Sequence, residues 1–325
     1  MKSLRNPMSA TPKLSTNISI VLMNENVNLV EIFYVADGFC KELYKTMEGR
    51  TLTENNSIKR RNRPSELNDA EVLTILIVFH LRVFRNLKHL YINYIQRYLA
   101  SYFPQTVSYN RFVELQKKAL LPMMVLLKTL RLGQDTVISF VDSTPIRVCR
   151  NKRIFNYKVF KGVATRGKST IGYFFGFKLH IVVNDKGEIL NFVITPGNVD
   201  DRDPLKDPNF LKNIFGKLFA DKGYVSKKLF ETLFVDGIKL ITGLRNNMKN
   251  QLMSLSDKIL LRKRSIIETI NDELKNICQI EHSRHRSFAN FLTNMISGLL
   301  AYSFLPKKPR IKYETVNTYG QISIC

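Results

Sequence analysis

Acidic residues are few in this chain relative to basic ones. The 325 residues include 27 Asp and Glu against 50 Lys and Arg, which gives a formal net charge of +23. A positive surplus of this size favours a polyanionic partner, because each phosphate that a basic side chain neutralises releases counterions. The composition therefore indicates nucleic acid as the partner, with an anionic membrane surface as the alternative.

Long hydrophobic runs are also absent, although 44% of the residues are hydrophobic. No stretch approaches the ~20 consecutive apolar residues that a membrane-spanning helix needs. The first seven residues include Lys2 and Arg5 and lack the continuous apolar core of a signal peptide. We therefore expect a cytosolic protein with no membrane partner.

Cysteine is rare, and its spacing excludes two kinds of site. The four cysteines, Cys40, Cys149, Cys278 and Cys325, lie far apart and form no CxxC pair. This spacing disfavours both a disulfide framework and a zinc site, and it is typical of reduced thiols in a cytosolic protein. Internal repeats and low-complexity blocks are absent too. A chain of this length can bury a main domain and a smaller one.

The first 64 residues are expected to form an N-terminal region that is partly helical and partly poorly ordered. Residues 1–24 are rich in polar residues and proline, which predicts little order. Apolar residues over 27–47 follow the period of an amphipathic helix, in which Gly38 is a potential break. Residues 51–64 read as a linker whose basic run, 59–63, could touch DNA or remain a solvated charge run.

Residues 65–132 are expected to be a small all-α domain. Asn68 followed by Glu71 is a capping-box pattern and predicts a helix start. Helices are predicted over 72–84, 86–102 and 108–130. Arg and Lys interleaved with apolar positions suit a helix-turn-helix-like DNA-binding domain, and they suit a plain helical packing domain equally well. We assign DNA binding to this domain as a hypothesis.

After Gly133 the sequence pattern changes from helices to strands. Strands are predicted over 137–141, 172–183, 188–195, 218–220 and 238–242, and helices over 204–215, 226–234, 256–278 and 288–304. Pro145 is expected to end the first strand, because proline has no N–H to donate. The order β, β, β, α, β, α, β, α predicts an α/β domain over 133–305, with a mixed sheet flanked by helices. The ribonuclease H-like fold has this order. Residues 306–325 would then be a basic C-terminal tail.

Two aspartates follow predicted strands of this sheet. Asp142 comes after the first strand and Asp221 after the fourth, and these strands are neighbours in a ribonuclease H-like sheet. Clustered carboxylates repel one another unless a cation neutralises them. Hard oxygen ligands select Mg²⁺ or Mn²⁺, and two such ions about 4 Å apart can support phosphoryl transfer. The alternative for Asp142 is a residue that caps a turn.

The late helix supplies candidates for a third acid. Glu268 shares one face of the predicted helix with Arg264, Asn271 and Lys275, opposite the apolar stripe. Arg264 and Glu268 are also spaced as an i, i+4 ion pair, which is common on solvated helices. Asp272, Glu273 and Glu281 are rivals for the same role.

At this point the chain resembles a known family. Three segments carry the resemblance: Phe140–Thr144, Phe219–Tyr224, and Arg264 followed by Glu268 and Lys275. They are similar to the three signature regions of bacterial insertion-sequence DDE transposases, which belong to the ribonuclease H-like integrase/transposase superfamily. Gly176–His180 and Thr195–Asp201 also stand where this family has its second strand and the loop after its third. The resemblance covers roughly residues 135–305, and more loosely the helical region from Ser65. It departs at Leu261, where the family usually carries a tyrosine.

The resemblance implies a function and a set of site residues. Asp142, Asp221 and Glu268 would be the catalytic triad that binds two Mg²⁺ or Mn²⁺ ions. The protein would cut double-stranded DNA at the terminal inverted repeats of a mobile element and join the ends to target DNA. The implied phosphate contacts are Arg264, Lys275, Lys222 and Arg147, and for each of them the alternative is a surface charge with no special role. A homodimer or higher oligomer on DNA in the bacterial cytosol, associated with the nucleoid, is expected.

Two other functional classes stay open at this stage. The same acids would serve a metal-dependent nuclease or resolvase that cuts without strand transfer. The basic charge alone would suit a non-catalytic DNA-binding protein, such as a decayed transposase. His180 could line the site or be a packed core histidine.

Overall fold

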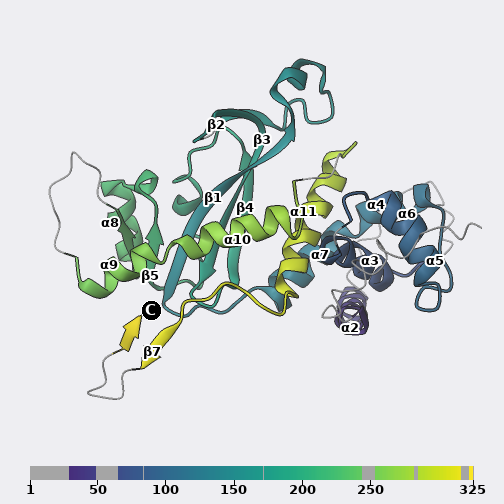
Figure 1. The fold of residues 1–325 in the computed structure, drawn as a ribbon, viewed down its shortest axis with the longest axis horizontal. Helices are drawn as coiled ribbons and strands as arrows, with labels where there is room; N and C mark the ends of the chain where they lie inside the picture. The colour runs from purple at the N-terminus through teal and green to yellow at the C-terminus, as the bar shows by residue number, and fades with distance from the viewer. Residues whose placement is uncertain are drawn as a thin grey trace, which may run out of the picture.

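A mixed sheet and a cluster of helices make up the chain in the computed structural model (Figure 1). The structure describes residues 29–48, 65–82, 84–170, 172–243, 253–281, 285–315 and 322–324. The expectations for residues 1–24 and 51–64 therefore lie outside the described residues. Among the helices within these ranges, none combines the length and the apolar character needed to cross a membrane.

The N-terminal part of the described chain is helical, as predicted. Its elements are α2 (Leu29–Met47), α3 (Asp69–Leu81), α4 (Leu87–His89), η1 (Leu90–Ile95), α5 (Gln96–Tyr98), α6 (Tyr109–Lys118), α7 (Leu120–Leu126) and η2 (Leu127–Arg131). The predicted capping box is confirmed: Asn68 Oδ1 accepts from the Glu71 N–H at 2.7 Å, and Glu71 Oε2 accepts from the Asn68 N–H at 2.8 Å. α2 runs through Gly38 without a break.

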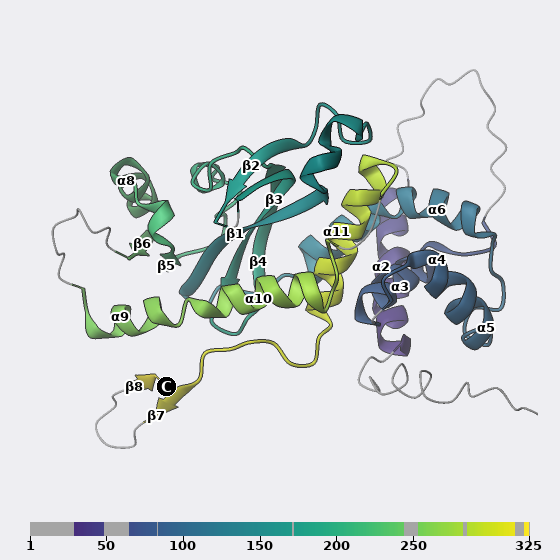
Figure 2. The same cartoon turned by 45° about the horizontal axis from the view of Figure 1, so that its top comes forward.

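Helix α11 (Phe288–Ser303) joins this helical part to the sheet. Nearly all of its residues from Asn290 onward are buried, because α3, α6 and α7 pack on one side and the sheet on the other (Figure 2). On the sheet side, the ring of Phe291 stacks on Phe177 with centroids 4.9 Å apart. The phenol of Tyr302 donates a hydrogen bond to the Gly187 carbonyl at 2.7 Å. One hydrophobic core consequently runs from the helices into the sheet.

The central sheet is mixed, as the sequence predicts. Its strands are β1 (Ile138–Cys149), β2 (Thr165–Ser169), β3 (Gly172–Asn184), β4 (Ile189–Pro196), β5 (Gly216–Ala220) and β6 (Ile238–Thr242). The order β4-β3-β1-β5-β6 has antiparallel β4-β3 and β3-β1 pairs followed by parallel β1-β5 and β5-β6 pairs. The short strand β2 was not predicted. β2 pairs with the first residues of β3, 172–176, and β4 pairs with the residues that follow, 177–183. After α11 the chain forms a two-stranded ribbon, β7 (Tyr313–Thr315) and β8 (Ile322–Ile324).

The prediction that Pro145 ends the first strand is wrong. β1 continues to Cys149, and Pro145 pairs with Lys178 of β3. The carbonyl of Val137 accepts a hydrogen bond from the Lys217 N–H of β5. Backbone polar groups of a strand point to alternate sides, so every second residue after Val137, including Pro145, turns its nitrogen toward the β5 side. The β1-β5 pairing stops at Phe140. The missing N–H of Pro145 therefore lies at an uncovered edge, where a strand tolerates proline.

Two helix predictions also need correction. Of the helix predicted over 204–215, only a 3₁₀ turn forms, η4 (Pro204–Lys206), because Pro208 holds Asp207 in the extended region, with ψ 114°. The helix predicted over 256–278 is two helices, α9 (Leu255–Arg262) and α10 (Ser265–Asn276). The break falls at Lys263 and Arg264, both of which keep αR backbone angles.

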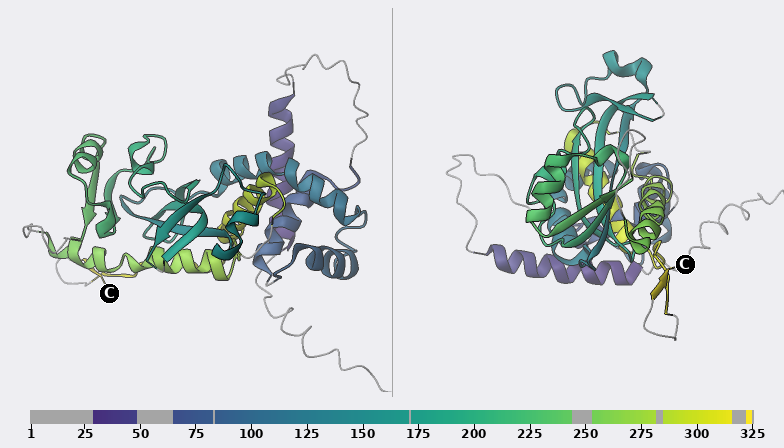
Figure 3. Two further views of the ribbon diagram at one scale, coloured as in Figure 1. Left: turned by 90° about the horizontal axis from the view of Figure 1, so that it is seen from above. Right: turned by 90° about the vertical axis from the view of Figure 1, so that its left-hand side faces the viewer.

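Different elements cover the two faces of the sheet (Figure 3). α10 and α11 lie on one face, over the core shared with the helical part. α8 (Lys227–Val235) and the segment 205–214 lie on the other, over a second core that also includes the short turn η5 (Lys222–Tyr224). Ser226 caps α8 by accepting from the Leu229 N–H, as predicted. The edge where β5 ends is thus flanked by α10 on one face and by η5 on the other.

Candidate active site

Asp142 and Asp221 lie at the same edge of the sheet. The last pair of the parallel β1-β5 ladder is Phe140 with Phe219, and the rings of these two residues stack 5.4 Å apart. Asp142 follows two residues after Phe140 and Asp221 two residues after Phe219. The sequence-predicted pair of aspartates therefore comes from adjacent strands: Asp221 follows the end of β5, whereas Asp142 lies within β1, just past its last pair with β5.

Helix α10 brings a third carboxylate toward this edge. Ile267, Ile270 and Leu274 pack into the core and fix the rotation of the helix. On its adjoining face, Asn271 donates from Nδ2 to Asp142 Oδ2 at 3.2 Å. Glu268 precedes Asn271 by about one turn, which aligns it on the face that meets Asp142.

Arg264 joins two of these acids. Its Nη2 lies 2.7 Å from Glu268 Oε1 and 3.8 Å from Asp221 Oδ1. The i, i+4 ion pair anticipated from the sequence therefore exists, but the same guanidinium also reaches across to the end of β5. Arg264 precedes α10 at the turn after α9, and its side chain is only 19% exposed. A partly buried cation between carboxylates indicates concentrated negative charge at this edge.

The charge on Asp142 is costly where it lies. The pKa of Asp142 is raised to about 6, chiefly by burial and in smaller part by the like charges of Glu268 and Asp201. A hydrogen bond from the Ser143 N–H and the charge of Arg264 act in the opposite direction. The acids that act on Asp142 are therefore Glu268 and one residue with no predicted role, Asp201.

The three rivals of Glu268 have other surroundings. Glu281 Oε1 accepts from the backbone N–H of Arg147 at 2.8 Å. Asp272 accepts from Asn276 one turn along the exposed face of α10. Burial raises the pKa of Glu273, with Lys308 of the C-terminal segment opposing the shift.

The four predicted phosphate contacts differ in position. Arg264 lies between the acids. Lys275 is largely buried beside them, and its pKa is lowered by burial while Glu281 and Asp142 oppose the shift. Lys222 follows Asp221 directly, and its aliphatic stem lies against Gly243. Arg147 is exposed farther along β1, beyond the carboxylates. The structure thus brings Arg264 and Lys275 to the acids, and leaves Arg147 at the periphery.

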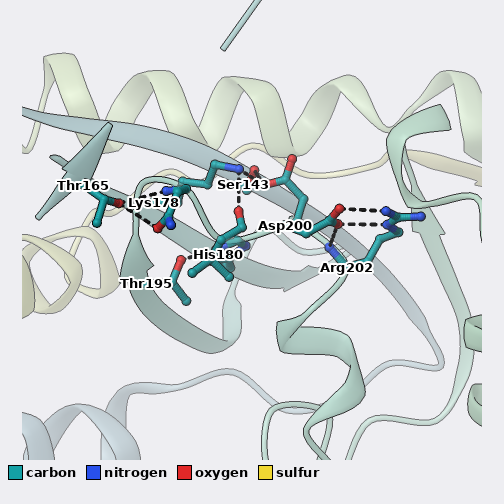
Figure 4. A network of polar contacts seen from close by, with 10 residues as sticks. Ser143, Thr165, Lys178, His180, Thr195, Asp200 and Arg202 are labelled. Carbon is teal, nitrogen blue, oxygen red and sulfur yellow. Dashed lines mark hydrogen bonds and ion pairs between the residues drawn. The ribbon is translucent and has the colours of Figure 1, made fainter. Parts of the chain in front are cut away.

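A polar network under Asp142 was missed in the sequence. Asp201 Oδ1 accepts from Ser143 Oγ at 2.7 Å and from Lys178 Nζ at 2.8 Å, and Lys178 also donates to the Val199 carbonyl (Figure 4). His180 is buried on the same strand as Lys178, and its Nε2 lies 2.8 Å from Thr195 Oγ1. Burial lowers the pKa of His180 to about 4. His180 is therefore a packed, neutral residue of the sheet beside the network.

Tyr224 is a second residue that the sequence did not single out. It is 2% exposed in η5, and burial raises the pKa of its phenol, followed by the charges of Asp142 and Asp201. The sequence signal for both residues was available. Asp201 and Tyr224 each end a segment that carries the family resemblance, Thr195–Asp201 and Phe219–Tyr224.

The acids at this edge have the chemistry of a site for a hard divalent cation. Asp142, Asp221 and Glu268 offer carboxylate oxygens, the ligands that Mg²⁺ and Mn²⁺ prefer. An ion there would relieve the like-charge repulsion that acts on Asp142. Within the described ranges, no three His, Cys, Asp or Glu side chains already converge closely enough to hold an ion. Arg264 occupies the approach between Asp221 and Glu268, so an ion would compete with its ion pairs.

One family model matches the part of the chain that contains this site. Residues 132–288 match the family model described as "Transposase DDE domain". A cryo-EM structure of the piggyBac transposase synaptic complex with hairpin DNA is similar to the chain, with 11% sequence identity and a TM-score of 0.47. That alignment covers 88% of this chain and 72% of the other. No curated protein matches the chain.

Proposed function

We propose that this protein cuts DNA at the ends of a mobile element and joins those ends to target DNA, a function that the match of residues 132–288 to the transposase DDE domain model supports. The proposal rests chiefly on one observation. A single guanidinium, that of Arg264, contacts the acid that follows β5 and the acid on α10, beside the buried acid of β1. This observation supports a site in which carboxylates from three separate elements face a phosphodiester at the end of β5.

The proposed ligands of the metal ions are Asp142, Asp221 and Glu268. When bound, two Mg²⁺ or Mn²⁺ ions supply an activated oxygen nucleophile and neutralise charge on the leaving oxygen. The protein's own part is to hold the three carboxylates ionised and at fixed separation. Asn271 and the Ser143 N–H support this role at Asp142, since both donate to its charged form.

The reaction we propose has two steps. In the first, water attacks the phosphorus at the element end, the bond to the 3′ oxygen breaks, and a free 3′-hydroxyl and a 5′-phosphate result. In the second, that 3′-hydroxyl attacks a phosphodiester of the target strand, so one P–O bond forms as another breaks. Both steps need the nucleophile held in line with the leaving oxygen, which fixed carboxylates at a rigid sheet edge favour.

The cations around the acids would bind the DNA backbone. Arg264 and Lys275 are proposed to contact phosphates beside the scissile bond, and Lys222 and Arg147 those farther away. Double-stranded DNA, both the terminal inverted repeats and the target, is the proposed partner. The helical domain of residues 65–132 would contribute further DNA contacts, in a homodimer or higher oligomer assembled on DNA in the bacterial cytosol.

A product assay tests this function. Purified protein is incubated in Mg²⁺ or Mn²⁺ with labelled DNA that carries the inverted repeats flanking its coding sequence, together with a target plasmid. We expect nicks at the repeat tips and joined products, both absent with Asp142→Asn. Nicks without joining would indicate a nuclease or resolvase, and binding without nicks a non-catalytic DNA-binding protein.

A further inference from the structure

A groove of about 670 Å³ lies beside the carboxylates, and the site described above does not use it. It runs between β2, the first residues of β3 and the loop 197–201, and it reaches Gly223 of η5. Figure 1 shows β2 and the start of β3 side by side at this end of the sheet. We call it the β2 groove.

The charges in the β2 groove do not cancel. Its two acids are each satisfied within the protein: Asp201 pairs with Lys178, and Asp200 pairs with Arg202 through two hydrogen bonds (Figure 4). Arg166 and Lys168 of β2 also line the groove and are exposed. Within the described ranges, neither makes a salt bridge. The uncompensated charge is therefore positive, which suits a phosphate backbone.

An aromatic ring stands next to these cations. Tyr173 pairs with Lys168 across the β2-β3 ladder, so their side chains leave the same face. The side chain of Tyr173 is 62% exposed, although it lies in a sheet whose other large aromatics are mostly buried. An exposed ring beside cations is an arrangement on which nucleic-acid bases stack.

The wall of the β2 groove is tightly packed. A Cβ added to Gly167 would lie 2.1 Å from the Gly197 carbonyl oxygen, and one added to Gly197 would lie 3.0 Å from the ring of Phe174. Thr165 and Asn198 are hydrogen bonded across the same contact. These contacts fix β2 against the loop 197–201, so Arg166, Lys168 and Tyr173 are presented by a rigid support.

The β2 groove leads to the proposed reaction site. Gly223, at its end, is two residues from Asp221. Asp201, in its wall, accepts a hydrogen bond from Ser143, which is adjacent to Asp142. A strand that left the carboxylates in this direction would pass Arg166, Lys168 and Tyr173 within a few nucleotides.

We propose that the β2 groove binds an unpaired segment of the DNA strand next to the scissile phosphate. Arg166 and Lys168 bind its phosphates, and a base stacks on Tyr173. The segment must be unpaired, because the faces of bases in a duplex are covered by their neighbours and offer nothing to an aromatic ring. This inference rests on the proposed function, since it takes DNA as the substrate.

The test compares two DNA substrates of one sequence. In one the nucleotides flanking the repeat tip are paired, and in the other they are unpaired and carry 2-aminopurine, whose fluorescence reports stacking. Binding is measured with the full-length chain in EDTA, so that no cleavage is needed. Tyr173→Ala should weaken binding of the unpaired substrate about tenfold, the loss of one base stack, and leave the paired substrate unaffected. Tyr173→Phe should bind like wild type.

Two further variants complete the test. Arg166→Ala with Lys168→Ala should weaken the unpaired substrate more than the matched control Arg153→Ala, an exposed cation of η3 (Asn151–Asn156) outside the groove. The inference is overturned if Tyr173→Ala binds both substrates like wild type, or loses both equally. If wild type binds neither DNA and cuts no repeat end in Mg²⁺, the proposed function itself fails. If wild type cuts the repeat ends and Tyr173→Ala binds both substrates like wild type, only the role of the β2 groove is contradicted.

Discussion

The amide of Asn271 donates a hydrogen bond to Asp142 across 129 residues of sequence. Asp142 belongs to the central strand of the sheet and Asn271 to the helix that crosses it, so this bond sets the carboxylate of β1 relative to α10. The other polar atom of this side chain, Asn271 Oδ1, is buried without a hydrogen-bond partner. Burying an amide oxygen without a partner costs free energy, and the hydrogen bond that the same amide donates to Asp142 offsets this cost.

Replacing Asn271 by Ala should impair catalysis mostly at low pH. The lost donor stabilises the ionised form of Asp142, so the pKa of Asp142 should rise above its value of about 6. The acid limb of the pH–rate profile should move up by roughly 0.5–1 unit, the equivalent of one hydrogen bond of about 1 kcal/mol. Asn276→Ala, on the exposed face of the same helix, is the control. An equal loss of rate at every pH would mean that Asn271 is only a packing residue.

Glu268→Gln should abolish nicking and leave the fold intact. The substitution keeps the size and helix propensity but removes the charge proposed to hold a metal ion. Because Glu268 is exposed, loss of its i, i+4 ion pair with Arg264 should cost no more than ~0.5 kcal/mol. Melting temperature and nicking of a repeat substrate in Mn²⁺ are the measurements. Asp272→Asn is the matched control. Normal nicking by Glu268→Gln would mean that Asp272, Glu273 or Glu281 is the third acid instead.

Lys178 and Asp201 should be energetically coupled in catalysis. Lys178→Met leaves Asp201 without its cation and close to Asp142, which should raise the pKa of Asp142 and slow cleavage. Asp201→Asn removes that charge, so the double variant should be faster than Lys178→Met alone. A double-mutant cycle on the nicking rate should give a coupling of about 1 kcal/mol. Strict additivity of the two effects would separate this pair from the reaction.

Stability should fall in mild acid because of buried histidines. Burial lowers the pKa of His80 to about 4, against 6.5 in an unfolded chain, so between these values the unfolded state binds more protons. The stabilisation is complete above about pH 6.5 and is lost as the pH falls toward 4. His80→Asn can still donate to the Cys278 carbonyl but does not titrate. The difference in melting temperature between about pH 7.5 and about pH 5 should shrink in His80→Asn, and not in the exposed control His89→Asn.

DNA binding should depend steeply on salt. A chain with a net charge of +23 that makes many phosphate contacts releases many counterions, so the plot of log affinity against log salt should have a large negative slope. Replacing the exposed Arg147 by Ala should reduce that slope by about one if it contacts a phosphate. Fluorescence anisotropy across a salt series measures both. A flat wild-type line would assign the positive charge to another purpose.

Local patterns were sufficient for most of the fold and failed where distant segments decide. The capping box at Asn68 and the cap at Ser226 depend on neighbouring residues, and both formed as predicted. Pro145 was expected to end β1, and nothing near it in sequence reveals that β5 stops short and leaves its nitrogen uncovered. The helix predicted over 204–215 was a misreading of local chemistry, since Pro208 was visible in the sequence.

The site divides in the same way. Asp142 and Asp221 could be named from the sequence because each follows a short apolar run, although β1 continues past Asp142. Arg264 was named as well, but its contact with Asp221, 43 residues earlier in the chain, could not be predicted from the spacing of residues on the helix. Asp201 stood in a segment that carries the family resemblance, but nothing adjacent in sequence pointed to its contact with Ser143. It reaches Ser143 only because the loop after β4 folds back over β3.

The burial of α11 restricts how such a chain can evolve. This helix comes after the other long helices in sequence, and both the helical part and the sheet pack against it. Exchange of the N-terminal helices for an unrelated domain would remove the contacts that α3, α6 and α7 make with α11. Changes in the helical part should therefore arise by substitution on its outer helix surfaces, whereas fusions of whole modules should be confined to the ends of the chain.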